Sequence, residues 1–189
     1  MDPTAEFRER DALLERIQSY AGEHGLVPLT LEDVAAALRM PLSSLRGYFD
    51  TKEELVVAVI AQARVRIREA FASIERSESM DFVERKRAMW KFVQERELDF
   101  RFFFEVFGLA LHDQHYGAFM HGIDDWIGLM KESMLSRGMS HERVDALATL
   151  LLAVYRGLMM DLCATGDRAR VNAAMELCFG LLASLDIAG

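Results

Sequence analysis

Several residues able to bind metal or transfer protons gather in the middle of the chain. His112 and His115 are three residues apart, so a helix would present both on one face. Asp113 and His121 lie near them, but no Cys or carboxylate completes a standard ligand spacing, and we expect no metal and no cofactor. The chain also lacks a nucleophile-elbow motif and a glycine-rich phosphate loop. The sequence therefore predicts a protein that is not an enzyme, with Glu105 and His112 as the pair to test for catalysis.

Aromatic and methionine side chains are concentrated in the same region. Eleven of the 18 aromatic residues lie between Phe82 and Trp126, and nine of the 11 Met residues lie from Met80 onward. Such residues build ordinary helical cores, but they also line adaptable cavities, and as a set they favour a pocket for a small apolar or aromatic molecule. The candidate effector-binding residues are Trp90, Phe103, Glu105, Phe107, His112, Phe119, Trp126, Met130, Tyr155 and Met159.

The elements that must position these residues are helices. All three prolines fall within the first 41 residues, and the rest of the chain has apolar residues at spacings of three and four. No segment alternates with a period of two, so we predict an all-α fold. The expected helices cover residues 4–24, 31–38, 42–48, 52–74, 81–96, 100–111, 116–137, 142–164 and 168–185.

Two of these helices are short and are separated by a tight turn. In a helix-turn-helix, the first helix braces across the DNA backbone and the second enters the major groove. The segments are Thr30–Leu38, TLEDVAAAL, and Leu45–Leu55, LRGYFDTKEEL, with Tyr48-Phe49-x-x-Lys52 as the most specific part. Over roughly residues 8–59 the chain resembles the N-terminal domain of the tetracycline-repressor (TetR) family. Residues 158–167 look like the C-terminal helices of that family.

The resemblance implies a homodimer that binds operator DNA and releases it when a small ligand enters the C-terminal domain. It implies that Leu42, Ser43 and Ser44 meet base edges. By residue type Thr30 is a good N-cap, with Asp33 three residues on as in a capping box. The resemblance implies that Thr30, at this helix N-terminus, Tyr48 and Lys52 hold phosphates. Tyr48 and Phe49 would otherwise be core residues of the small domain, which is the role we expect for Phe49. By this division, residues 1–51 bind DNA, and residues 52–189 bind the ligand and form the dimer.

Three positions depart from the family pattern. Arg39 stands where the turn usually carries Gly, so a positive φ is expected at a residue that rarely adopts one. Pro41 replaces the usual Ser or Thr cap of the second helix. Arg46 replaces an aromatic residue and would reach a guanine edge or a phosphate, or remain a solvated charge. We therefore add Arg39 and Arg46 to the candidate DNA-binding residues.

The charge balance limits how such a protein can bind DNA. The chain has 22 Lys and Arg against 30 Asp and Glu, a net charge of −8, which excludes a broadly basic surface but not a small basic patch. Residues 1–55 hold six cationic and eleven anionic side chains, whereas residues 39–52 hold three and one. We expect modest, salt-sensitive DNA binding. The alternative is a ligand-sensing helical dimer whose DNA binding is weakened or lost.

The remaining features concern partners and location. The last two expected helices are apolar over a wide arc, which favours a symmetric four-helix interface with a second copy. The N-terminus is not a signal peptide, and the longest apolar stretch, near residues 146–155, is too short to span a bilayer, so we expect a cytoplasmic protein without a membrane partner. Cys163 and Cys178 would be buried thiols or, alternatively, a redox sensor.

Overall fold

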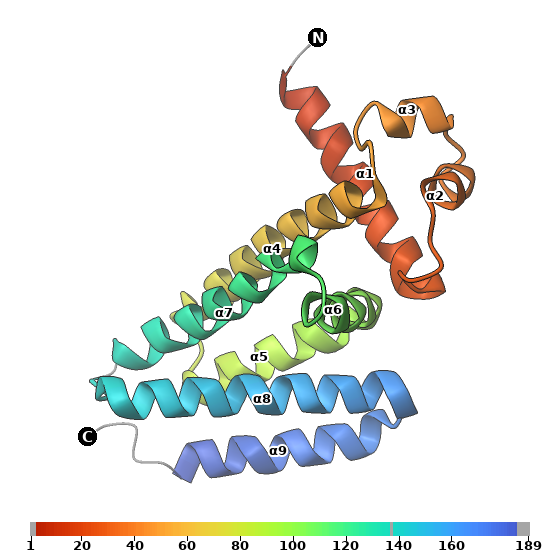
Figure 1. Ribbon diagram of the computed structural model, residues 1–189. Coiled ribbons are helices and arrows are strands. Elements are labelled where there is room, and N and C mark those ends of the chain that lie inside the picture. Colours follow the sequence, from red (N-terminus) through yellow and green to blue (C-terminus); the bar gives the residue numbers. More distant parts are fainter. Residues whose placement is uncertain (1–2, 137, 185–189) are drawn as a thin grey trace. The chain divides into compact units, whose positions relative to one another are not determined.

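The computed structural model describes residues 3–136 and 138–184, with side chains given for all of these except 3–7, 118, 120–126 and 133. The described residues form α-helices and one 3-10 turn, with no strand (Figure 1), which confirms the all-α fold. The elements are α1 (Pro3–His24), α2 (Leu31–Ala37), α3 (Leu42–Arg46), α4 (Lys52–Glu75), α5 (Phe82–Gln94), α6 (Glu97–Ala110), η1 (Gln114–Tyr116), α7 (Ala118–Leu135), α8 (His141–Thr165) and α9 (Arg168–Ser184).

The expected helices differ from the observed ones mainly at their ends. The second short helix ends at Arg46, not at Tyr48. Helix α6 begins at Glu97, three residues before the expected start, with Glu97 and Asp99 in its first turn, where acidic side chains suit the helix dipole. The expected helix 116–137 is split into η1 and α7, and residue 137 lies outside the described residues, as does residue 185.

The chain forms two compact units. The first contains residues 1–66 and 101–122, and the second contains residues 67–100 and 123–189. Helices α4, α6 and α7 each begin in one unit and continue into the other.

The first unit is built around apolar faces of α1, α4 and α6. Ile17 of α1, Val59 of α4 and Phe102 of α6 are each completely buried. The short helix α2 begins with a capping box: the hydroxyl of Thr30 accepts the Asp33 N–H at 3.1 Å, and the Asp33 carboxylate accepts the Thr30 N–H at 3.1 Å. This arrangement confirms the cap predicted from the sequence, and it satisfies N–H groups that the helix cannot pair.

Thr51 caps the helix that follows the two short ones. Its hydroxyl accepts the N–H of Glu54 at 3.1 Å, and the Glu54 carboxylate accepts the N–H of Asp50 at 2.9 Å. By residue type, Asp50 and Thr51 are equally good caps. The structure shows that Thr51 is the cap. The cap starts α4, a helix of 24 residues, after a connection of five residues that follows α3.

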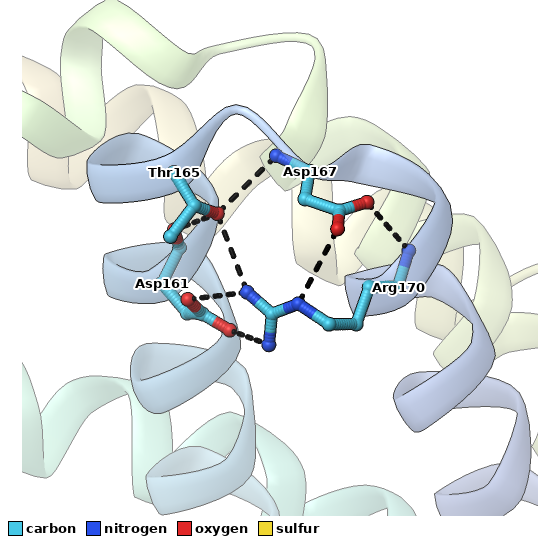
Figure 2. A network of polar contacts seen from close by, with 4 residues as sticks. All are labelled: Asp161, Thr165, Asp167 and Arg170. Atoms are coloured by element: carbon cyan, nitrogen blue, oxygen red, sulfur yellow. Dashed lines mark hydrogen bonds and ion pairs between the residues drawn. The ribbon is translucent and has the colours of Figure 1, made fainter.

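The second unit contains the hairpin of α8 and α9, which run side by side in opposite directions (Figure 1). Gly166, with φ of 69°, ends α8 in the left-handed conformation that favours glycine. Figure 2 shows how Arg170 closes the corner: its guanidinium pairs with Asp161 at 2.7 Å and with Asp167 at 3.4 Å. The hydroxyl of Thr165 accepts the N–H of Asp167 at 3.2 Å. These contacts give a physical role to the segment that resembles the family's C-terminal helices.

Helix α8 is long and apolar enough to cross a membrane by length and composition alone. Core helices pass the same test, and α8 buries Val144, Leu151 and Met159 within its own unit. We therefore interpret it as a core helix.

Candidate functional site

The candidate base-reading residues lie on the exposed surface of α3. Leu45 is completely buried and anchors the helix, whereas Ser43 and Ser44 are exposed and Leu42 is half-buried. Pro41 stands at the N-cap and gives no side-chain hydrogen bond, as its missing donor and acceptor groups predict. Anchoring through Leu45 leaves the two hydroxyls free to face a partner.

The turn between α2 and α3 has the unusual backbone that the sequence predicted. Arg39 has φ of 55°, in the left-handed region that glycine favours, and its side chain is exposed. The neighbouring backbone is held from two sides: the N–H of Met40 donates to the carbonyl of Ala35 at 3.0 Å, and the Arg16 guanidinium donates to the carbonyl of Leu38 at 3.0 Å. These bonds hold the turn in a conformation that costs a non-glycine residue about 1–2 kcal/mol.

Two of the three cationic side chains in residues 39–52 have partners within the chain. The Arg46 guanidinium pairs with the Glu32 carboxylate of α2 at 3.1 Å, and both side chains are 58% exposed. The Lys52 ammonium donates to the carbonyl of Val27 at 3.0 Å. Both groups therefore have an intramolecular partner that phosphate oxygens would have to replace or share.

The two aromatic residues after α3 have different environments. Phe49 is 3% exposed and confirms the expected core role, with the guanidinium of Arg10 above its ring at 5.8 Å. Tyr48 is 39% exposed, so its phenol is accessible to a partner. Thr30 is also exposed, but its hydroxyl already serves the capping box of α2. Its position leaves the N-terminus of α2 at the surface.

Five of the candidate effector-binding residues belong to the first unit. The ring of Phe119 lies 5.8 Å from that of Phe103 and 6.5 Å from that of Phe107, measured between centroids. Glu105 does not stand free in this apolar helix, because its carboxylate accepts the N–H of Leu26 at 2.5 Å. Glu105 thereby satisfies a backbone N–H group just after α1. His112 is exposed.

Four other candidates are buried in the second unit. The rings of Trp90 and Tyr155 meet edge to face at 5.7 Å, and Met130 and Met159 are at most 1% exposed. The Trp90 indole donates to Asn172 at 3.0 Å. The predicted set is thus divided between the units, and the side chain of Trp126 lies outside the described residues.

Sequence reasoning missed a buried ion pair in the second unit. The ammonium of Lys86 is completely buried and pairs with the Glu75 carboxylate, and the ring of Phe82 lies 4.9 Å from it. The hydroxyl of Tyr155 donates to the Lys86 carbonyl at 2.5 Å, and burial raises the pKa of that phenol. The spacing of Phe82, Lys86 and Trp90 at i, i+4 and i+8 would have placed the lysine on the buried face.

An open groove of about 710 Å³ lies along the first turns of α4 in the first unit. Glu53, Glu54 and Asp113 contribute carboxylates to it, and the floor is apolar. The backbone N–H of His115 donates to the Asp113 carboxylate at 2.9 Å, and the imidazole of His115 lies 2.8 Å from the same carboxylate. Both contacts lower the pKa of Asp113. Among the described side chains, no three His, Cys, Asp or Glu residues are arranged to hold a metal. The carboxylates make this groove unsuitable for phosphate.

Neither cysteine forms a disulfide, and both are half-buried, not fully buried as the simpler interpretation held. Burial raises the pKa of Cys178, which keeps it in the thiol form and lowers its reactivity.

Comparison with models of known protein families and with curated protein sequences gives no match. Solved structures do match. A TetR transcriptional regulator of Legionella pneumophila is 16% identical with a TM-score of 0.80, covering 90% of this chain and 94% of that one. A TetR-family regulator of Streptomyces coelicolor is 17% identical with a TM-score of 0.75, covering 95% and 96%. SmeT, in complex with triclosan, is 14% identical with a TM-score of 0.70, covering 91% and 88%. The chain has the fold of the TetR-family transcriptional regulators.

Proposed function

We propose that the protein is a dimeric one-component transcriptional regulator. Helices α2 and α3 bind operator DNA, and a small apolar or aromatic effector releases it. The observation that carries the proposal is the exposed surface of α3, where Ser43, Ser44 and Arg46 are accessible in a chain with this fold. Arg39, Tyr48 and Lys52 would add contacts to phosphates around it. Such a protein acts in the cytoplasm, where its DNA is.

Exposed apolar side chains on the α8–α9 hairpin support a homodimer. Leu150 and Met160 of α8 are 59% and 52% exposed, and Leu177 and Leu181 of α9 are 68% and 62% exposed. Each pair recurs along one face of its helix, among the exposed small residues Ala146, Ala153, Gly157, Ala173 and Gly180. Burying these faces against a second copy would form a four-helix interface and set the separation of two α3 helices.

The aromatic core of the second unit supports a small apolar or aromatic effector. Trp90, Tyr155 and Met159 form an aromatic and sulfur-rich core in the second unit, and SmeT, which has the same fold, binds an aromatic compound. Helix α4 follows the DNA-reading segment along the chain and ends in the second unit, so it is one of the elements able to couple the two events. An effector that favours one arrangement of α4 would shift the population away from DNA binding.

A second candidate function is a ligand-sensing dimer with weak DNA affinity. It is favoured by the intramolecular partners of Arg46 and Lys52, which are Glu32 and the Val27 carbonyl. It is also favoured by the excess of anionic side chains over residues 1–55.

Titration of labelled DNA from upstream of the protein's own gene, followed by anisotropy at two salt concentrations, distinguishes the two functions. The regulator is expected to bind specifically at both concentrations. Lys52→Ala should weaken binding to all sequences alike, because a phosphate contact carries no sequence information. Lys91→Ala is the matched control, since Lys91 is 79% exposed on α5 and pairs with Glu95, the C-cap residue of that helix. A folded dimer that binds no DNA at low salt would contradict the regulator.

A further inference from the structure

The connection between α1 and α2, residues 25–30, is held by side chains from two other helices. The Glu105 carboxylate of α6 accepts the N–H of Leu26 at 2.5 Å. The Lys52 ammonium, at the start of α4, donates to the carbonyl of the neighbouring Val27 at 3.0 Å. All four residues belong to the first unit, whereas α4 and α6 both continue between the two units. The connection therefore receives a bond from each of two helices that also belong to the second unit.

The way in which α1 ends leaves the N–H of Leu26 to Glu105. Gly25, with φ of 85°, follows the helix in the left-handed conformation, and its own N–H returns to the Ala21 carbonyl at 2.9 Å. The Glu105 carboxylate lies against this glycine, since a Cβ atom at Gly25 would be 3.6 Å from Oε1 and 3.8 Å from Oε2. Leu26 is 1% exposed, so removal of Glu105 would leave its N–H buried without this acceptor.

The same connection leads into α2. The N–H of Leu29 donates to the Leu26 carbonyl at 3.3 Å, and Leu29 is 5% exposed. The next residue is Thr30, whose hydroxyl caps α2. An ammonium has three donors, so the bond from Lys52 to the Val27 carbonyl orients the side chain and leaves donors for a phosphate. Fixing Leu26 therefore fixes both the start of α2 and the acceptor that orients Lys52.

The two bonds to the connection differ in strength. A carboxylate acceptor makes a shorter hydrogen bond than a neutral one, roughly twice as strong, and Glu105 is half-buried. The bond from Lys52 is exposed, where water and phosphate compete for the ammonium. The carboxylate of α6 therefore sets the position of the connection, and Lys52 follows it.

We propose that Glu105 is a positioning residue for DNA binding: through the N–H of Leu26, it fixes the connection that starts α2 and orients Lys52. This inference rests on the proposed function and deepens it, because it assigns the contact by which a displacement of α6 changes the affinity for DNA. Glu105 itself contacts neither DNA nor effector in this scheme.

Amide hydrogen exchange of the full chain without DNA measures the effect on the connection. Glu105→Ala should raise the exchange rates of residues 26–30 by about tenfold. Their intrinsic rates stay the same, because the substitution lies 79 residues from Leu26. Glu105→Gln keeps a neutral acceptor and should raise the rates less, and it replaces Glu105→Ala in every measurement if that variant does not fold. Glu97→Ala is the matched control, because it removes the same charge from the same helix, at a side chain that pairs with Arg168.

Fluorescence anisotropy with labelled DNA measures the effect on binding, at a temperature where every variant is folded. Glu105→Ala should weaken DNA binding by about fivefold, whereas Glu97→Ala should leave it unchanged. Because Glu105 acts partly through Lys52, its loss should cost less affinity in the Lys52→Ala background. A general loss of stability would not produce this non-additivity.

Four results would overturn the proposal. They are unchanged exchange in Glu105→Ala, an equal rise in Glu97→Ala, undiminished DNA affinity in Glu105→Ala, and losses that simply add for Glu105→Ala and Lys52→Ala. If the unchanged protein binds no DNA, the regulator function fails. The exchange measurement contains no DNA, so it then still decides whether Glu105 fixes the connection.

Discussion

Glu32→Gln is the substitution that examines the DNA-binding surface most directly. Glu32 holds the guanidinium of Arg46 at 3.1 Å on the surface that carries Ser43 and Ser44. The amide keeps the shape of the side chain but removes its charge, so Arg46 becomes free to reach a phosphate or a guanine. We expect Glu32→Gln to bind DNA more tightly than the unchanged protein.

The structure sets the expected magnitudes. Both members of the pair are 58% exposed, and exposed pairs of this kind contribute about 0–1 kcal/mol, so the free energy of unfolding should change by less than about 1 kcal/mol. Each additional phosphate contact steepens the dependence of log K on log salt by about 0.9. Raising the salt from 50 to 200 mM should therefore lower the DNA affinity of Glu32→Gln by about threefold more, for each freed arginine, than it lowers that of the unchanged protein.

Fluorescence anisotropy over that range of salt measures both quantities. Glu53→Gln is the matched control, because Glu53 lines the acidic groove and loses the same charge without releasing a cation. Arg46→Gln in the Glu32→Gln background supplies the double-mutant cycle. The reasoning is refuted if the gain in affinity survives the loss of Arg46, or if Glu53→Gln gives an equal gain.

Three further substitutions examine the second unit. Leu177→Asp, at a side chain that is 68% exposed, should leave the fold intact and convert the proposed dimer to a monomer in light scattering; a dimer of unchanged mass would exclude this face. Asp161→Asn should flatten the acid limb of the stability curve: Arg170 lowers the pKa of Asp161 in the folded state, so its contribution is present above the unfolded pKa and is lost as the pH falls through the folded one. If urea unfolding shows the same acid dependence in both proteins, the pair contributes nothing. Tyr155→Phe should lower the free energy of unfolding by about 1 kcal/mol or more, because the buried Lys86 carbonyl loses its donor; no change in urea titration would contradict that bond.

Local features of the fold were predictable because they depend on neighbouring residues. Thr30 and Asp33 are three residues apart and cap α2 as expected. The positive φ at Arg39 followed from a missing glycine in a recognisable turn. Such features are determined by backbone sterics and by hydrogen bonds that span a few residues.

The candidate sites were predictable only in part. Leu150 and Leu177 lie within the apolar arcs of the last two helices, but the arcs alone do not separate them from Leu151 and Leu162, which are buried in their own chain. An apolar residue on a wide apolar arc can face its own core or a second copy, and only the packing of the neighbouring helices decides between them.

The sequence by itself determined the helical class, the order of the helices and the tight turn before α3. It also determined that any DNA-binding surface must be a small patch, because the net charge is −8. Tertiary structure decided which polar groups meet: Glu105 accepts the N–H of Leu26, 79 residues away, and Glu32 holds Arg46. It also left the Nη2 atom of Arg156 buried without a hydrogen bond. The physical reason is that helix formation depends on contacts within a few residues, whereas the pairing of a charge depends on which elements the whole chain brings together.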